Sequence, residues 1–285
     1  MSTMNARRSG GSKITWAVVA VVLVFVAVLV CIRVIGTQDN TSAAASGTRR
    51  SSAVVLREIA IPNLGVANAV GVTSRATPVT PPLTIARQPS LTSHGRPEIL
   101  YVGAEFCPYC AAERWPLALA LGRFGTFSRL DLTNSAPSPE AYPLTPTFTF
   151  YQSTYSSKYV TFVSVESQTR THQPLMTMTK IDGALVSKYD VEKYLPVNGP
   201  GPGGSIPFLD FGNRFFQAGA SFTPALLAGM SPSSIAKGLD NPASPVTQAI
   251  VASANYLTAD ICALTREQPA RICLSSGVQA ARARR

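Results

Sequence analysis

Two cysteines separated by two residues are the part of this sequence best suited to covalent chemistry. Cys107-Pro108-Tyr109-Cys110 precedes residues 111–124, whose richness in Ala, Leu, Glu and Arg predicts a helix. A cysteine at a helix N-terminus lies beside unpaired backbone N–H groups and the positive end of the helix dipole, which favour the thiolate. Cys107 would then attack a disulfide as the nucleophile, and Cys110 would resolve the mixed disulfide. Pro108 favours a tight start to the helix.

The same spacing has two other interpretations, half of a zinc site or a purely structural disulfide. A zinc site needs a second pair of ligands. The candidates are Cys262 and Cys273, eleven positions apart, and two isolated histidines, His94 and His172. A structural disulfide within the motif would close a very short loop and gain little chain-entropy stabilisation. We therefore expect a redox-active pair, no metal site and no cofactor, while the two alternatives stay open.

Strands and helices that could position the motif surround it. The apolar run 99–103, bounded by Pro and Gly, predicts a buried strand that ends directly before the motif. A Gly-Asn turn at 212–213, between apolar runs, predicts a hairpin of strands 206–211 and 214–217. Strands are also predicted at 127–132, 146–151 and 159–165, and helices at 186–195, 233–239 and 245–264. This mixture of elements predicts an α/β domain.

At the motif the sequence resembles the thioredoxin superfamily. Residues 104–110, Ala-Glu-Phe-Cys-Pro-Tyr-Cys, are similar to the thioredoxin segment Ala-Glu-Trp-Cys-Gly-Pro-Cys, with a glutaredoxin-like centre. In that superfamily a cis-proline that opens a later strand faces the cysteines, and Ile206-Pro207 resembles this second element in the right order. The resemblance implies that Ile206 and Pro207 present backbone to the substrate. It also implies that Pro108 and Tyr109 contribute to substrate binding at the rim.

The sequence departs from the thioredoxin pattern in two ways. Thioredoxins place a buried Asp six residues before the first cysteine, where this chain has Tyr101, so Glu105 or water would have to transfer the proton. Between the helix after the motif and Pro207, a thioredoxin needs one β–α unit, whereas this chain has roughly eighty residues. We therefore predict an insertion at 152–200, and a helical extension at 218–281.

The wider sequence is most similar to a prokaryotic family, domain-of-unknown-function family 929. The likeness runs over residues 101–127, 142–159, 206–215 and 249–273, and so covers most of the outer domain. That family is thioredoxin-like by resemblance and its substrate is not established, so the likeness bears on fold more than on function. The predicted fold class is a thioredoxin-like α/β fold with an insertion and a helical C-terminal extension, preceded by one transmembrane helix.

A second cysteine pair lies near the C-terminus. We predict that Cys262 and Cys273 form a structural disulfide that pins the last segment to a helix. The alternative is a second redox pair that relays electrons to the first. Paired cysteines of either kind suit an oxidising compartment.

The positive charge of the chain is concentrated in its tails. The formal charge is +10, but residues 53–281 hold sixteen basic and fourteen acidic residues. The remainder comes from residues 1–52, with six basic residues and one acidic, and from three arginines in the last four positions. Basic tails beside a membrane segment more often set topology or contact anionic lipid, so we expect no nucleic-acid partner.

One apolar segment near the N-terminus predicts a membrane anchor. Residues 14–32 are nineteen positions without a charge, long enough for a helix to cross a bilayer core. The alternative to an anchor is a cleaved signal peptide, whose apolar run is usually shorter than this one. Three basic residues precede it, which places the N-terminus inside. The predicted divisions are a cytoplasmic tail 1–13, a transmembrane helix 14–35, a flexible linker 36–52, an extracytoplasmic domain 53–281 and a basic tail 282–285.

These features predict a membrane-anchored, extracytoplasmic thiol–disulfide oxidoreductase, held in the cell membrane by a single pass. Its partners would be protein thiols or disulfides, or a membrane redox partner. The alternative is a non-catalytic thioredoxin-like binding module of the cell envelope whose cysteine pair in the motif is permanently oxidised. Thiol trapping discriminates between the two.

Overall fold

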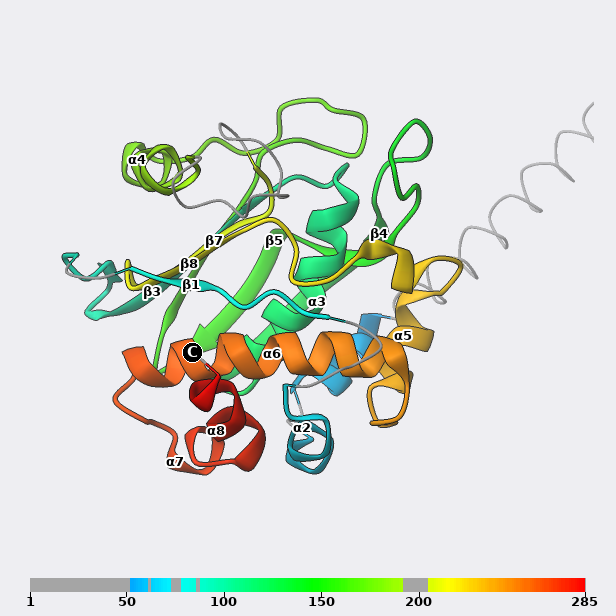
Figure 1. Ribbon diagram of the computed structural model, residues 1–285. Helices are drawn as coiled ribbons and strands as arrows, with labels where there is room; N and C mark the ends of the chain where they lie inside the picture. Colours follow the sequence, from blue (N-terminus) through cyan, green and yellow to red (C-terminus); the bar gives the residue numbers. More distant parts are fainter. Residues whose placement is uncertain (1–51, 61–62, 73–77, 86–87, 192–204, 285) are drawn as a thin grey trace, which may run out of the picture. The chain divides into compact units, whose positions relative to one another are not determined.

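The structure of the chain is a computed structural model that describes residues 52–60, 63–72, 78–85, 88–191 and 205–284 (Figure 1). The predicted cytoplasmic tail 1–13, transmembrane helix 14–35 and nearly all of the linker 36–52 lie outside the described residues. Within the described residues, no single helix has the length and apolar character needed to span a bilayer. The helices Ser52–Ala60 and Leu64–Val70 reach that length and apolar character only when they are taken together, and the pair is bent by 73°.

A six-stranded mixed sheet forms the centre of the domain. Its longest strand, β3, runs from Arg96 to Gly103 and is buried from Glu98 onward, as expected of a strand covered on both faces. β3 pairs in parallel with β6 on one side and antiparallel with β7 on the other, and β8 and β1 continue the sheet beyond β7. The short β2 pairs with the start of β3. The bounds of the other five strands are Leu83–Thr84 (β1), Thr92–Ser93 (β2), Thr161–Glu166 (β6), Phe208–Phe211 (β7) and Phe215–Ala218 (β8).

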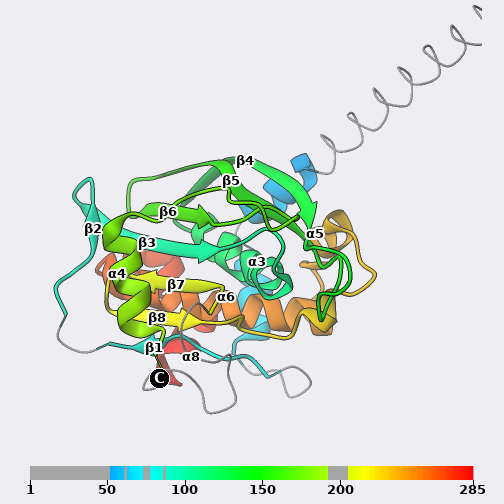
Figure 2. The ribbon, with the colours of Figure 1, turned by 90° about the horizontal axis from the view of Figure 1, so that it is seen from above.

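Alternating residues of β3 face two different hydrophobic clusters, because successive side chains of a strand point to opposite faces. Ile99 and Tyr101 pack in the larger cluster, which includes α3 (Pro108–Gly122) and α6 (Pro245–Leu264). Leu100 and Val102 pack in a smaller cluster with α4 (Lys180–Tyr189). The sheet therefore lies between α4 on one face and α3 with α6 on the other, as Figures 1 and 2 show.

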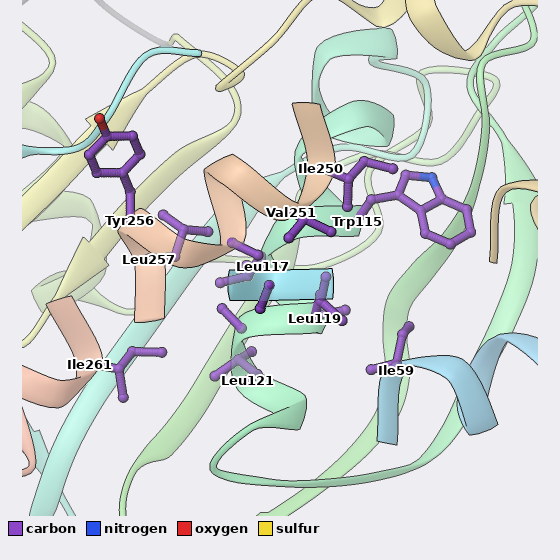
Figure 3. Close-up of a cluster of buried hydrophobic side chains, with 14 of the residues drawn as sticks. Ile59, Trp115, Leu117, Leu119, Leu121, Ile250, Val251, Tyr256, Leu257 and Ile261 are labelled. Carbon is purple, nitrogen blue, oxygen red and sulfur yellow. The ribbon is translucent and has the colours of Figure 1, made fainter. Parts of the chain in front are cut away.

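α3 is the central helix of the larger cluster. All of its residues except Tyr109 are buried, so it is apolar around most of its circumference, as a core helix is. Figure 3 shows side chains of α3 beside those of α6, with Leu117 near Leu257. Trp115 lies at the right-hand side of the cluster in this view. The helix therefore packs against other elements on nearly every side, and this packing holds its N-terminus in place.

The segment between α3 and β6 forms a separate two-stranded sheet. β4 (Gly125–Asn134) and β5 (Pro146–Ser157) pair antiparallel, with two register irregularities between Phe127 and Asp131. The structure differs here from the insertion predicted at 152–200. β6, which lies within those bounds, belongs to the main sheet, and α4 follows it, while residues 192–200 lie outside the described part. The predicted helix at 186–195 begins earlier, at Lys180.

The C-terminal part of the chain is helical, as predicted for 218–281. After β8 come a 3-10 turn and four helices, the longest of which, α6, coincides with the predicted helix at 245–264. The bounds of the other elements are Pro224–Leu227 (η1), Pro232–Gly238 (α5), Ala270–Cys273 (α7) and Ser276–Ala283 (α8). α8 contacts both α6 and α2 (Leu64–Val70), so the end of the described chain packs against α6 and against the first part of the domain.

Candidate functional site

The cysteine motif lies where β3 ends and α3 begins. Cys107 has an extended backbone conformation and is the N-cap of α3, with Pro108 at the first helical position. Its sulfur accepts a hydrogen bond from the backbone N–H of Cys110 at 3.2 Å. An N-cap side chain normally satisfies one of the unpaired N–H groups of the first turn, and here a thiolate would do so. The local sequence thus places Cys107 at the positive end of the helix dipole.

The two thiols are free and differ in environment. Cys107 is 5% exposed and Cys110 is fully buried. The Cys110 thiol, as a hydrogen-bond partner, lowers the pKa of Cys107 below its ordinary value, with help from backbone N–H groups and the Arg114 charge and against the effect of burial. Burial raises the pKa of Cys110 well above its ordinary value, and the neighbouring Cys107 adds to this. Cys107 is therefore the more easily ionised of the two thiols.

The peptide between Ile206 and Pro207 faces the first cysteine. This bond is cis, and the carbonyl oxygen of Ile206 lies 3.8 Å from the sulfur of Cys107, within hydrogen-bonding range for sulfur. Ile206 also packs against the small cluster formed by Ala104, Cys107 and Cys110. The carbonyl of Pro207 accepts a hydrogen bond from Gly219, which ties the start of β7 to the end of β8. The structure thus brings together two segments that lie almost a hundred residues apart.

Aromatic side chains border the motif on its exposed side. Tyr109 is 41% exposed, and its ring meets that of Tyr142 edge-on, with centroids 5.7 Å apart. The ring of Phe106 lies against that of His172, with the two centroids 4.1 Å apart. Tyr142 comes from the β4–β5 connection, and His172 from the loop after β6. Two loops remote in sequence therefore supply part of the rim around Cys107.

Glu105, the residue predicted to assist proton transfer, lies on the loop before Cys107. Its backbone N–H donates to the carbonyl of Gln168 at 2.9 Å, and its side chain is half-exposed. Within the described residues its carboxylate makes no hydrogen bond or ion pair. A role for Glu105 in proton transfer therefore stays a prediction.

A buried ion pair that the sequence did not reveal lies behind the cysteines. Arg114 of α3 donates to both carboxylate oxygens of Glu166, from Nε at 2.9 Å and from Nη2 at 2.7 Å, and neither side chain is exposed. Nη2 also donates to the carbonyl of Ala104 at 3.0 Å. Positions 107, 110 and 114 follow the spacing of one helix face, which is the signal that could have identified Arg114. The arginine therefore fixes the loop before Cys107 and places a positive charge near both sulfurs.

A second buried network links α3 to the cis peptide. The carboxylate of Glu113 accepts hydrogen bonds from the backbone N–H of Ser221 at 2.6 Å and from its hydroxyl at 3.0 Å. Gln217 donates to the same hydroxyl and to the carbonyl of Gly219, whose own N–H holds Pro207. Burial raises the pKa of Glu113 to about 7, and the hydrogen bonds from Ser221 oppose that shift.

The C-terminal cysteines form a disulfide in the structure. Cys262, in α6, and Cys273, in α7, are joined with their Cα atoms 5.6 Å apart. Both pack in the larger hydrophobic cluster, whereas Cys107 and Cys110 belong to a separate small cluster. The structure therefore does not bring the two pairs together. No group of three or more His, Cys, Asp or Glu side chains in the described residues is placed to hold a metal ion.

Comparison with known proteins places the chain in a family. The family described as "Domain of unknown function (DUF929)" matches residues 85–263, which is more than half of the chain. The chain belongs to the DUF929 family. The matched span of this DUF929 protein includes the cysteine motif, Arg114, Glu166 and Pro207, and ends just after Cys262. No curated protein and no solved structure matches the chain.

Proposed function

We propose that this DUF929 protein is a thioredoxin-like thiol–disulfide oxidoreductase that uses Cys107 as nucleophile and Cys110 as resolving cysteine. The observation that carries the proposal is the position of the Cys107 sulfur, which caps α3 and lies 3.8 Å from the carbonyl of Ile206. A dithiol catalyst needs a stabilised thiolate, a second thiol within reach and a backbone surface for the substrate, and this arrangement is consistent with all three.

The order and direction of the central elements support a thioredoxin-like fold. The chain runs β3, α3, β6, α4, β7, β8 and α6, with β6 parallel to β3 and with β7 and β8 antiparallel. A strand, a helix that starts with the cysteines, a parallel strand and then a hairpin that follows the cis-proline is the order expected for that fold. On this interpretation the β4–β5 hairpin is the added element, and it supplies Tyr142 to the rim.

The proposed reaction is a pair of thiol–disulfide exchanges. The Cys107 thiolate attacks one sulfur of a substrate disulfide, the substrate S–S bond breaks, and the departing substrate thiolate takes up a proton. Cys110 then gives up its proton and attacks the Cys107 sulfur. The mixed disulfide breaks, the second substrate thiol leaves, and Cys107 and Cys110 are joined by a new disulfide. The reverse sequence oxidises a substrate dithiol, and the reduction potential of the pair decides the direction.

The environment of the two thiols is consistent with Cys107 as the nucleophile and Cys110 as the resolving cysteine. The lowered pKa of Cys107 favours attack, while the raised pKa of Cys110 keeps the second thiol protonated until the mixed disulfide forms. The buried Arg114 charge acts on both sulfurs in the direction of the thiolate. The Cys262–Cys273 disulfide supports an oxidising, extracytoplasmic location, because such bonds are rare where thiols are kept reduced. A membrane anchor at 14–35 completes the proposal.

A trapping experiment on the full chain tests the function. Cys110→Ser leaves the attacking thiol but removes the resolving one, so mixed disulfides with physiological partners should accumulate and be released by dithiothreitol. The matched control, Cys107→Ser, keeps the same number of thiols and should capture nothing. In a disulfide-reduction assay with insulin, Cys107→Ala should lose turnover, and turnover equal to that of the unmodified chain would refute the proposal.

A non-catalytic binding module is the second candidate, and the low exposure of both sulfurs favours it. In that case the pair would stay oxidised at the potentials of the cell envelope. Alkylation of thiols in intact cells distinguishes the two functions. Modification of Cys107 without prior reduction indicates a cycling dithiol, while protection in every growth condition indicates the binding module.

A further inference from the structure

A basic cleft lies at the end of the sheet opposite the cysteines. Its volume is about 650 Å³, and its walls come from the start of β3, the β5–β6 connection, the β7–β8 turn and the segment after α6. Arg96 opens β3 and Gly103 ends it directly before the motif, so the cleft and the motif stand at the two ends of one strand (Figure 2). Eight residues of strand span roughly 23 Å. The cleft is therefore a separate site, and nothing in the dithiol chemistry uses it.

The lining of the basic cleft is cationic. Arg96, Lys158, Arg214 and Arg266 line it, and among the described residues no Asp or Glu does. This is unusual in a domain whose basic and acidic residues nearly balance, sixteen against fourteen over residues 53–281. Four like charges around one hollow repel one another and raise the local concentration of anions.

None of the four cations is neutralised within the described residues. Arg96 donates to the backbone carbonyl of Ser157 at 2.6 Å, and Arg214 donates to that of Ala263 at 3.3 Å. Lys158 lies 5.1 Å from the ring centroid of Tyr159, and no ion pair involves any of the four. The partners of Arg96, Arg214 and Lys158 are neutral and leave these charges uncompensated, so an anion would complete the arrangement.

The C-terminal disulfide holds one wall of the cleft. Arg266 lies in the loop closed by Cys262 and Cys273, with a φ of 53°, and Glu267 follows at 63°. Two consecutive non-glycine residues in the left-handed region need support from the surrounding structure. Two hydrogen bonds lie within this loop, from the Thr265 hydroxyl to the carbonyl of Gln268 and from the backbone N–H of Glu267 to the carbonyl of Cys262, and the disulfide closes it. The Glu267 carboxylate pairs with Arg282, which leaves the guanidinium of Arg266 without an acidic partner.

We propose that the basic cleft binds a phosphate-bearing anion. Three guanidinium groups favour phosphate, because their planar forks match its oxygens in bidentate hydrogen bonds. The volume exceeds that of a single phosphate ion, so the cleft has room for a ligand with more than one phosphate or for a phosphate with an attached group. A free polyphosphate and the headgroup of an anionic phospholipid share this chemistry, and the proposal stands whether or not the cysteine motif is catalytic.

Binding to the full chain in neutral detergent tests the proposal by titration calorimetry with two probes. One is inorganic pyrophosphate, and the other is phosphatidylglycerol in mixed micelles, with phosphatidylcholine as the reference lipid. Arg214→Gln combined with Arg266→Gln should weaken binding by about tenfold or more, since hydrogen bonds to charged groups contribute strongly. The control, Arg57→Gln with Arg129→Gln, removes the same charge from exposed arginines paired with Glu58 and Asp131, and should bind normally.

Each outcome has a defined meaning. If the cleft variant loses pyrophosphate binding and the control variant keeps it, the ligand is a free phosphate compound. If the cleft variant loses only the binding of phosphatidylglycerol, and the control keeps it, the ligand is a lipid headgroup. Binding should also weaken as ionic strength rises. The proposal is overturned if neither probe binds, if the cleft variant binds as well as the unmodified chain, or if the control loses affinity equally. Tighter, cleft-dependent binding of an oligonucleotide would assign the site to nucleic acid and overturn the proposal of a free polyphosphate or a phospholipid headgroup.

Discussion

Glu113 offers a quantitative test of the network that connects α3 to the Pro207 peptide. Its side chain is fully buried, and its pKa is about 7 in the folded protein against 4.5 for an ordinary glutamate. Since the folded state binds the proton more tightly than the unfolded state, the favourable contribution is complete below pH 4.5 and is lost as pH rises through 7. Each pKa unit is worth about 1.4 kcal/mol, so this group should lower the free energy of unfolding by about 2.5 kcal/mol between pH 5 and pH 8.

Glu113→Gln should remove this part of the pH dependence. Glutamine keeps an oxygen that can accept the hydrogen bond from Ser221, but it has no proton to lose. Urea unfolding of the full chain at pH 5 and pH 8, with the disulfide intact, measures the effect. The variant should lose about 2.5 kcal/mol less stability over this interval than the unmodified chain.

The comparison between chains isolates Glu113 from other buried acids. Burial also raises the pKa of Asp210 to about 7, so the unmodified chain has a further loss of the same sign, which the variant retains. Glu105→Gln removes one carboxyl group from a half-exposed loop and controls for the change in net charge. Parallel pH profiles for the unmodified chain and Glu113→Gln would refute the reasoning.

Three further predictions follow from particular contacts. Arg114→Met should lower the unfolding free energy by about 3–5 kcal/mol in urea, because Glu166 would be left charged and buried, and adding Glu166→Leu should restore much of the loss. Reduction of the disulfide between α6 and α7 should cost roughly 3 kcal/mol, since it releases a loop with a sequence separation of 11, and calorimetric melting of oxidised and reduced chain measures this. Gly277→Ala should lower the melting temperature, because its Cβ would lie 2.3 Å from the carbonyl oxygen of Ala67, while Gly183→Ala, in open space within α4, should not.

Elements with a strong local pattern were predictable from the sequence. The apolar run at 99–103 lies within β3, and the helix predicted at 245–264 has the observed bounds of α6. The start of α4 was predicted six residues too late. Thr179 and Asp182 form a capping box there, a local signal that outweighs the weak apolar periodicity of the helix.

The motif could be located from the sequence, but most of its surroundings could not. Helix capping by Cys107 depends on neighbouring residues, so it followed from local order. The pairing of Arg114 with Glu166 spans 52 positions, and that of Glu113 with Ser221 spans 108. Charged residues on an apolar helix usually suggest an exposed edge, whereas here each is buried because a partner arrives from another element.

By itself, the sequence determined which residues stand next to one another along the chain. It placed two thiols at the start of a helix, a hairpin after Pro207 and a long segment of chain between the two. Only the tertiary structure decided which distant groups meet: the Ile206 carbonyl beside Cys107, the ion pair behind it and the cations of the basic cleft. The physical reason is that local backbone preferences act over a few residues, while burial joins whichever elements cover each other's apolar faces and must then satisfy every polar group enclosed between them.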